Sequence, residues 1–227
     1  MAAKRIALLG HPVSHSRSPQ MQNAAFAAAG LDDWTYLALD VLDVVEAVDD
    51  LRAQGFAGAN VTIPHKQAVV AACDEADGDA VNTLIFRDGR VLGFNTDKEI
   101  VAGIDAARVC MIGAGGAARA LVPGLRGEIT WFSRRENWPP DATGCDLIVN
   151  ATPVRDELLV QPQPGQTVVD LAYGTEETAL VAAARAAGCE VVDGFEALVR
   201  QGAASFTLWT GLPAPVEEMR RAVHLSA

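Results

Sequence analysis

The sequence has few of the residues that build metal centres and disulfide frameworks. Its 227 residues include only four cysteines and four histidines. No two cysteines form a CxxC pair, and the histidines form neither an HxH nor an HExxH pattern. Because zinc sites and disulfide-rich folds depend on closely spaced residues of these types, we expect neither a bound metal nor a structural disulfide.

Positive charge and long apolar runs are also scarce. Lysine and arginine number 18 against 29 aspartate and glutamate residues, which gives a formal net charge of -11 at pH 7. A nucleic-acid-binding surface needs clustered basic residues, so this balance disfavours a nucleic-acid partner. No apolar run approaches the roughly 18 residues of a membrane-spanning helix, and the apolar stretch at residues 6–9 is too short for a signal peptide. These absences predict a cytoplasmic protein without a membrane partner.

Hydrophobic residues make up 50% of the chain, and strand-like segments alternate regularly with helix-like ones. This alternation predicts the α/β class, with an open, mostly parallel sheet in each half of the chain. A hairpin is expected over residues 80–94, with its turn at Asp88-Gly89. The helices that we expect span residues 18–29, 43–54, 65–74, 97–106, 117–125, 176–187, 195–209 and 215–223.

A glycine-rich turn follows the strand expected at residues 108–112. The chain from Cys110 reads CMIGAGGAARA, which places Gly113, Gly115 and Ala118 at GxGxxA spacing. In a βαβ unit the first glycine permits a tight turn, the second lets the backbone approach a pyrophosphate, and the small third residue lets the helix pack on the strand. The motif predicts a dinucleotide site, and a turn that binds nothing is the alternative.

The end of the next expected strand indicates which dinucleotide binds. NAD-binding proteins usually carry an acidic residue there, whereas this chain reads Phe132-Ser133-Arg134-Arg135 before its first carboxylate at Glu136. Ser133 could hydrogen-bond to a 2′-phosphate, and Arg134 could pair with its charge. The sequence therefore favours NADP over NAD, with two solvated surface arginines as the alternative.

Polar residues follow several strands of the first half, in segments 10–19, 60–66 and 95–97. Ligands in open α/β sheets bind beyond the carboxyl ends of the strands, so these segments predict a ligand site. The hydroxyl groups of segment 10–19 could hold a carboxylate, although a plain helix-capping loop explains them equally well. Lys66 is expected near a helix start, where a positive charge is mildly unfavourable, and this placement indicates a functional role.

Seven ordered segments, which extend over nearly the whole chain, resemble the shikimate dehydrogenase family. They are GHPVSHSRSP (10–19), NVTIPHK (60–66), AVNTL (80–84), GFNTD (93–97), GAGGAARA (113–120), NATP (150–153) and DGFEALVRQGAASFTLWTG (193–211). The resemblance implies an enzyme that reduces 3-dehydroshikimate to shikimate with NADPH, in the chorismate pathway to aromatic amino acids.

The same resemblance implies three regions of the chain. Residues 1–100 would form an α/β domain that binds the substrate and carries the catalytic groups. Residues 101–194 would form a compact Rossmann-type domain that binds NADP. Residues 195–227 would form C-terminal helices that return to the substrate domain.

Individual residues match functional positions of the family. Lys66 and Asp97 correspond to its catalytic pair. The residues that match its substrate contacts are Ser16, Ser18, Thr62, Asn82, Tyr173 and Gln201. The residues that match its cofactor site are Gly113, Ala114, Gly115, Gly116, Ala117, Ser133, Arg134, Arg135, Asn150, Ala151 and Thr152.

The chain also departs from the family, and mostly on the cofactor side. It is shorter than is usual, around residues 97–106, after Ala117 and between Arg134 and Cys145. Gly174-Thr175 follows Tyr173 where the family usually has a proline. These departures leave the cofactor preference more open than the identity of the catalytic pair.

Two other functions stay open from the sequence. One is a dehydrogenase of the same fold that acts on quinate, an amino-shikimate or a related ring acid. The other is a dinucleotide-binding paralogue without turnover, which the shortened cofactor half favours and the complete set of catalytic and substrate residues disfavours. The oligomeric state is open as well, and a homodimer is one option.

Overall fold

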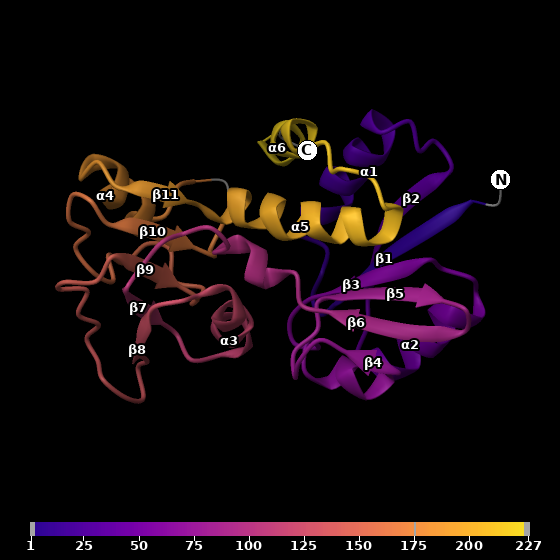
Figure 1. Cartoon of the computed structure of the whole chain (residues 1–227), viewed down its shortest axis with the longest axis horizontal. Helices are drawn as coiled ribbons and strands as arrows, with labels where there is room; N and C mark the ends of the chain where they lie inside the picture. Colours follow the sequence, from indigo (N-terminus) through magenta and orange to yellow (C-terminus); the bar gives the residue numbers. More distant parts are fainter. Residues whose placement is uncertain (1–2, 175, 225–227) are drawn as a thin grey trace. The chain divides into compact units, whose positions relative to one another are not determined.

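The protein is described by a computed structural model that covers residues 3–174 and 176–224. These residues form two compact units (Figure 1). The first unit contains the chain up to Thr96 together with the chain from Val199 onward, and the second contains Asp97–Leu198. Within the described ranges, no helix is both long enough and apolar enough to cross a membrane.

The first unit is built on a six-stranded sheet. Its strands are β1 (Lys4–Gly10), β2 (Trp34–Asp40), β3 (Gly58–Val61), β4 (Glu75–Ala76), β5 (Thr83–Arg87) and β6 (Arg90–Phe94). Their order across the sheet is β2-β1-β3-β5-β6-β4. β1 runs parallel to β2 and β3, whereas β5 pairs antiparallel with both β3 and β6. β4 runs parallel to β6, so five of these six strands run in one direction and β5 is the exception. The expectation of a mostly parallel sheet is therefore confirmed for this half, although the hairpin places one antiparallel strand beside β3.

The first unit contains four helices or parts of helices among the described residues. They are α1 (Ser18–Ala28), α2 (Val44–Ala53), α6 (Val216–His224) and the part of α5 (Gly194–Thr210) that follows Leu198. α2 begins where the Asp43 carboxylate accepts hydrogen bonds from the amides of Val45 and Glu46. Its apolar face packs with residues of β1 and β3 in one buried cluster. α6 packs against α1, so the end of the chain returns to the first unit.

The second unit contains a five-stranded sheet in which every strand is parallel to its neighbours. The strands are β7 (Arg108–Ile112), β8 (Glu128–Phe132), β9 (Leu147–Asn150), β10 (Thr167–Asp170) and β11 (Glu190–Val192), in the order β11-β10-β9-β7-β8. This sheet confirms the parallel arrangement that the apolar strands predict, since strands buried on both faces read as continuous apolar runs.

Helices cover both faces of the second sheet. Met111 on β7 packs with Ala118 of α3 (Gly116–Leu121), whereas its neighbour Ile112 packs with Leu180 of α4 (Ala179–Ala186). Successive strand residues face opposite sides of a sheet, so α3 and α4 lie on opposite faces. The arrangement agrees with the Rossmann-type domain that the family resemblance implies.

Three expected helices are much shorter than their patterns indicate. The helix expected at 65–74 is the 3-10 turn η1 (Ala68–Ala72), because the next residues form β4. The helix expected at 97–106 is the 3-10 turn η2 (Asp97–Ile100).

The third shortened helix has a clear cause. α3 ends at Leu121 and passes into the 3-10 turn η3 (Val122–Gly124), which contains Pro123. Proline has no backbone amide hydrogen and cannot continue an α-helix, so the expectation of a helix to residue 125 is wrong. α4 likewise starts three residues later than expected, because the Thr178 side chain accepts the Val181 amide and caps the helix there.

Candidate active site

The candidate residues of the first unit begin in the loop between β1 and α1. The Ser18 amide donates to Ser16 Oγ at 3.2 Å, and Ser18 itself is buried. The Ser18 side chain is hydrogen-bonded to the hydroxyl of Tyr36 on β2. Burial raises the pKa of the Tyr36 hydroxyl far above its ordinary value, so this group stays protonated and can donate. Tyr36 donates its proton to Asn60 Oδ1 at 2.8 Å.

Asn60 on β3 connects this loop to the rest of the unit. Its amide nitrogen lies within hydrogen-bond distance of the Asn82 carbonyl at 2.9 Å, Thr83 Oγ1 at 3.0 Å and Ser205 Oγ at 3.0 Å. All of these residues are buried, so each polar atom depends on protein partners. We call the connected side chains Tyr36, Asn60, Asn82, Thr83, Thr96 and Ser205 the Asn60 network.

Asn82 lies at the other end of the Asn60 network. Its Oδ1 accepts hydrogen bonds from the Thr96 amide at 2.8 Å and from Thr96 Oγ1 at 3.0 Å. These two bonds fix the backbone immediately before Asp97. Ser205 Oγ lies 2.8 Å from Thr83 Oγ1 and donates to the Gln201 carbonyl at 3.1 Å. The network thus joins Asn82 and the helix segment that carries Gln201.

Two contacts hold α5 in the first unit near Gln201. Gln22 Nε2 donates to the Gly202 carbonyl at 2.9 Å, and Trp209 Nε1 donates to the Leu84 carbonyl at 3.0 Å. A Cβ at Gly202 would lie 2.3 Å from the Met21 methyl carbon, so a larger residue there would force the Met21 side chain to shift. The position of Gln201 is therefore fixed from both sides of its helix.

Thr62 and Lys66 follow β3 in a tight segment. The His65 amide donates to the Thr62 carbonyl at 2.9 Å, and the buried His65 ring contacts the Val41 carbonyl through Nε2 at 2.8 Å. The Lys66 carbonyl accepts the Val81 amide at 2.8 Å, which places the Lys66 backbone beside the residue that precedes Asn82. The first unit thus ties the segments that carry Ser18, Thr62, Lys66, Asn82 and Gln201 to one hydrogen-bonded framework.

Asp97 and Tyr173 belong to the second unit. Asp97 is buried at the start of η2, and it follows Thr96 directly. The catalytic pairing of Lys66 with Asp97 stays a prediction. Tyr173 packs its ring against Phe195 with a centroid distance of 5.4 Å.

The glycine-rich turn lies between β7 and α3. Gly113 has a φ of +108°, and a Cβ there would lie 3.0 Å from the Ala151 carbonyl oxygen. A side chain at position 113 would strain the local backbone and crowd the Ala151 carbonyl, so this position requires glycine. Gly115 and Gly116 differ, because no atom lies within 4 Å of the Cβ position at either residue. This open space fits the close approach of a dinucleotide phosphate, which is the role that the motif predicts for Gly115.

The loop at 150–152 is shaped by the buried side chain of Asn150. Its Oδ1 accepts hydrogen bonds from the Thr152 amide at 3.0 Å and from the Thr152 hydroxyl at 2.6 Å, and its Nδ2 donates to Asp170 Oδ1 at 2.9 Å. These contacts engage both ends of the Asn150 amide within the protein. Contact of Asn150, Ala151 and Thr152 with a cofactor stays a prediction, and Asn150 shapes the backbone of that loop.

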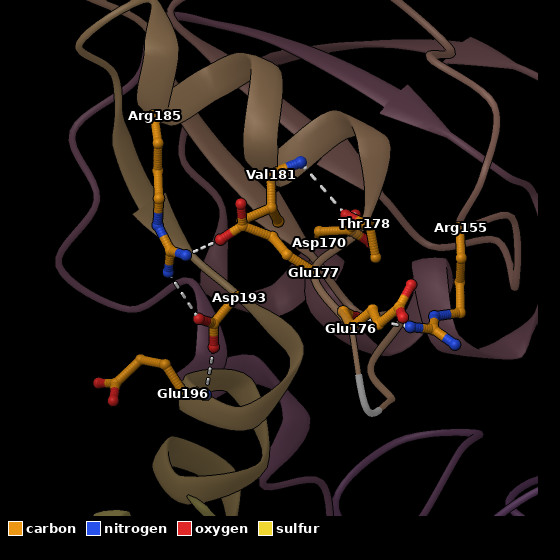
Figure 2. A network of polar contacts seen from close by, with 9 residues as sticks. All are labelled: Arg155, Asp170, Glu176, Glu177, Thr178, Val181, Arg185, Asp193 and Glu196. Atoms are coloured by element: carbon orange, nitrogen blue, oxygen red, sulfur yellow. Dashed lines mark hydrogen bonds and ion pairs between the residues drawn. The ribbon is translucent and has the colours of Figure 1, made fainter.

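Polar contacts of Asp170 fix the ends of β9 and β10, and Figure 2 shows Asp170 beside Thr178 at the start of α4. Besides Asn150, the Asp170 carboxylate accepts the Ala172 amide at 3.0 Å and the Thr178 hydroxyl at 2.6 Å. Burial raises the pKa of the Asp170 carboxyl, although these hydrogen bonds act in the opposite direction. Asp170 thereby joins the loop at 150–152, the residues that lead to Tyr173, and the N-terminus of α4.

Arg134 at the end of β8 has partners that the sequence did not reveal. Its guanidinium pairs with Glu157 Oε2 at 2.7 Å and lies over the Trp138 ring at 5.0 Å from the centroid. Ser133 and Glu136 exchange two backbone hydrogen bonds of 2.9 Å, which closes the turn that carries Arg134 and Arg135. Arg135 is exposed. A 2′-phosphate at this site would meet Arg134 already paired with a carboxylate.

Among the described residues, no three His, Cys, Asp or Glu side chains come together in a group that could hold a metal ion. All four cysteines are free. Tyr36, Thr83, Thr96 and Ser205 are the residues that the sequence reasoning missed in this site. Thr83 and Thr96 lie inside the matched segments AVNTL and GFNTD, and Ser205 lies one helical turn after Gln201, which is the signal that could have identified them.

Comparisons with known proteins find matches at both ends of the chain. A family model described as the shikimate dehydrogenase substrate binding domain matches residues 8–84, and one described as the shikimate 5'-dehydrogenase C-terminal domain matches residues 194–224. The chain is 39% identical to the shikimate dehydrogenase (NADP(+)) of Moorella thermoacetica, over 95% of this chain and 91% of that protein.

Solved structures resemble the chain over almost all of its length. Shikimate 5-dehydrogenase from Thermus thermophilus, in complex with NADP(H) and shikimate, has a TM-score of 0.84 and 32% identity, over 96% of this chain and 98% of that one. Quinate dehydrogenase from Corynebacterium glutamicum, in complex with NAD, has a TM-score of 0.83 and 26% identity, over 98% of this chain and 99% of that one.

Proposed function

The chain belongs to the shikimate dehydrogenase family, and from this premise we propose that it catalyses the reversible, NADP-dependent reduction of 3-dehydroshikimate to shikimate. The observation that carries this proposal is the Asn60 network. It holds the segments of Ser18, Asn82 and Gln201, three residues that match the family's substrate contacts, in one buried and hydrogen-bonded arrangement. The reaction belongs to the biosynthesis of aromatic amino acids through chorismate.

The proposal assigns a different task to each unit. The first unit, which includes the C-terminal helices, supplies most of the groups assigned to the substrate, and the second unit supplies those assigned to NADP(H) together with Asp97 and Tyr173. In this assignment, residues that follow strands of the first unit supply the side-chain hydroxyls and amides that bind the substrate. The second unit supplies the glycine-rich turn and the basic end of β8.

Substrate binding is assigned to neutral groups. Ser16 and Ser18 hold the carboxylate of the ring acid, and Thr62, Asn82, Tyr173 and Gln201 contact its hydroxyls. A protein with a net charge of -11 repels an anion at long range, so local hydrogen-bond donors must capture it. A site that hydrogen-bonds several hydroxyls discriminates strongly, because an analogue without one of them leaves a buried polar group unpaired.

The proton chemistry is assigned to Lys66 and Asp97. Reduction of a ring ketone requires a hydride on carbon and a proton on oxygen. The Lys66 ammonium donates to the carbonyl oxygen and stabilises the negative charge that develops there. Asp97 is assigned the task of orienting that ammonium.

NADPH supplies the hydride when it is bound. Gly113, Ala114, Gly115, Gly116 and Ala117 would hold its phosphates, and the open space at Gly115 and Gly116 fits that role. Ala151 and Thr152 would line the same site on a backbone shaped by Asn150. Ser133, Arg134 and Arg135 would contact the 2′-phosphate.

The test is an absorbance assay in the reduced-nicotinamide band with purified protein. Shikimate, quinate and an amino-shikimate are each supplied with NADP or NAD. We expect the fastest reduction with shikimate and NADP. Faster turnover of quinate with NAD would contradict the proposal. The substrate would then be quinate and the cofactor NAD, as the name of the similar protein from Corynebacterium glutamicum indicates for that protein. No reduction of NADP or NAD with any of the three ring acids would favour a non-catalytic dinucleotide-binding protein.

We further propose that the protein is located in the cytoplasm. The assembly to be tested is a homodimer. Both follow from the enzyme class rather than from a particular contact. Fractionation of the native host tests the first, and light scattering of the purified protein tests the second. Recovery in a membrane or secreted fraction would contradict the location.

A further inference from the structure

Arg134, which is assigned to the 2′-phosphate, is held in a defined position. The turn that carries it is closed by the two backbone hydrogen bonds between Ser133 and Glu136. Its guanidinium lies over the Trp138 ring, which limits its side-chain rotamers. The remaining contact of this guanidinium is the ion pair with Glu157 at 2.7 Å.

Glu157 is presented by a segment that is anchored on both sides. Two residues earlier, the Arg155 guanidinium donates to the Glu176 carbonyl at 2.6 Å, and the Arg155 carbonyl accepts the Ala179 amide at 2.7 Å (Figure 2). Two residues later, Leu159 is buried in the core with α4. Since the backbone at Glu157 is held in place, its side chain loses less conformational freedom on pairing with Arg134 than it would in a free loop.

The surroundings of this pair carry no excess of positive charge. Arg134 and Arg135, with Arg155 in the neighbouring segment, are matched by three carboxylates, those of Glu136, Asp156 and Glu157. A 2′-phosphate carries a charge near −2 and needs an unpaired guanidinium for its strongest hydrogen bonds. Within this group the Glu157 carboxylate is the one that contacts the guanidinium directly.

We propose that Glu157 is a specificity-determining residue that weakens the preference for NADP over NAD by competing with the 2′-phosphate for Arg134. This inference rests on the proposed function, since it assigns Arg134 to the cofactor. To contact Arg134, the 2′-phosphate must displace Glu157 or share the guanidinium with it. NAD has a hydroxyl group at that position, so it binds without disturbing the pair.

The size of the effect follows from the exposure of the pair. The side chains of Arg134 and Glu157 are 62% and 56% exposed. Exposed ion pairs are weak, so release of Arg134 from its partner should tighten NADP binding by about two- to five-fold. NAD binding should change little, because the pair does not have to open for it.

The experiment measures the dissociation constants of NADP and NAD by titration calorimetry without substrate. Glu157→Gln removes the charge of the carboxylate with little change in shape. Glu136→Gln is the matched control. It also removes one negative charge from the turn of Arg134, but it leaves the ion pair of Arg134 with Glu157 in place. Arg134→Ala and the double variant with Glu157→Gln complete a mutant cycle, which isolates the pairwise effect.

We expect Glu157→Gln to lower the Kd of NADP two- to five-fold and to leave the Kd of NAD within experimental error. The effect should exceed that of Glu136→Gln and should disappear when Arg134 is alanine. An equal change for both nucleotides, an equal effect of the two glutamate variants, or persistence in the Arg134→Ala background would overturn the inference. Failure of shikimate oxidation would instead count against the proposed reaction, since these binding constants are measured without turnover.

Discussion

The two units position their candidate ligand groups in different ways. In the first unit, side chains are fixed by other buried side chains, as the contacts of Asn60 with Tyr36, Thr83 and Ser205 illustrate. In the second unit, the glycine-rich turn is shaped by backbone contacts, and the charge of Arg134, which we assign to the 2′-phosphate, lies on the surface. A substitution in the first unit should therefore remove function steeply, whereas one on the surface of the second should change it gradually.

The largest effect is expected from Lys66→Ala in the first unit. Loss of the ammonium removes the proton donor, and general acid groups contribute about 10²- to 10⁴-fold to rates. Turnover should fall by that factor, while the Kd for shikimate, measured by calorimetry, stays within a few-fold. Lys4→Ala, at an exposed lysine at the start of β1, is the control and should leave both quantities unchanged. Near-normal turnover of Lys66→Ala would remove Lys66 from the mechanism.

The Asn60 network should respond next most strongly. Asn60→Leu has a similar volume but leaves the Tyr36 hydroxyl, the Asn82 carbonyl and Ser205 with one partner fewer in a buried site. At roughly 1–3 kcal/mol for a buried group left unsatisfied, the free energy of unfolding should drop by about 3 kcal/mol. Urea denaturation measures this loss.

Asn23→Leu provides a comparison for that experiment, because Asn23 is an exposed asparagine whose side chain bonds only to the Tyr36 backbone. We expect a loss of about 1–2 kcal/mol there, since each of its two neutral hydrogen bonds contributes roughly 0.5–1.5 kcal/mol. Equal losses at the two positions would contradict the expectation that the buried Asn60 network contributes more to the free energy of unfolding than the exposed Asn23 contacts do.

Arg134→Ala tests the surface charge of the second unit. The Kd of NADP should rise about 10-fold, because hydrogen bonds to a charged group contribute about 1.5–3 kcal/mol and part of this is already offset by Glu157. The Kd of NAD should rise much less. Equal losses for the two nucleotides would refute the assignment of Arg134 to the 2′-phosphate.

Two glycines of the same turn should give opposite results. Gly113→Ala places a Cβ near the Ala151 carbonyl at a φ of +108°, so we expect a loss of about 1–3 kcal/mol in stability. Gly115→Ala has an ordinary φ of −80° and open space, so stability should stay within about 0.5 kcal/mol. Its Kd for NADP should nevertheless rise, because the added methyl group occupies the space proposed for a phosphate. Denaturation and calorimetry on both variants decide this.

The smallest effect concerns the pH dependence of stability at Asp170. Its pKa is raised in the folded protein, so the folded state holds this proton more tightly than the unfolded chain does. The contribution of Asp170 is therefore fully present below the unfolded pKa of about 3.9 and is lost as the pH rises through the folded pKa. Asp170→Asn removes this dependence. The stability of the parent protein relative to the variant should thus decrease across that window, and a constant difference would contradict the assignment.

In both units the sequence predicts the strands better than their order across the sheet. Continuous apolar strands such as Leu147–Val149 and the glycine-rich turn depend on local pattern, and both appear as expected. The Asp88-Gly89 turn is also local, and its two residues have φ values of +52° and +74°. The insertion of β5 beside β3 is different, because strand order is decided by distant pairing that no local pattern encodes.

The missed contacts of the site have the same cause. Ser205 is 145 residues from Asn60, and Glu157 is 23 residues from Arg134. Nothing in the segment around Glu157 marks it as a partner of an arginine. The residues that match functional positions could be chosen from the sequence, but the groups that hold or compete with them depend on the folded chain.

The first unit is made of two separated stretches of the chain, and this affects how the protein folds as it is synthesised. The second unit is continuous, so it has all of its residues once Leu198 has left the ribosome. The first unit lacks Ser205 and Trp209 until the last part of the chain emerges, and until then the amide of Asn60 and the carbonyl of Leu84 miss a partner. The half of the enzyme that is translated first is thus completed last. A premature stop before α5 would release a chain whose second unit is almost whole and whose substrate site cannot assemble.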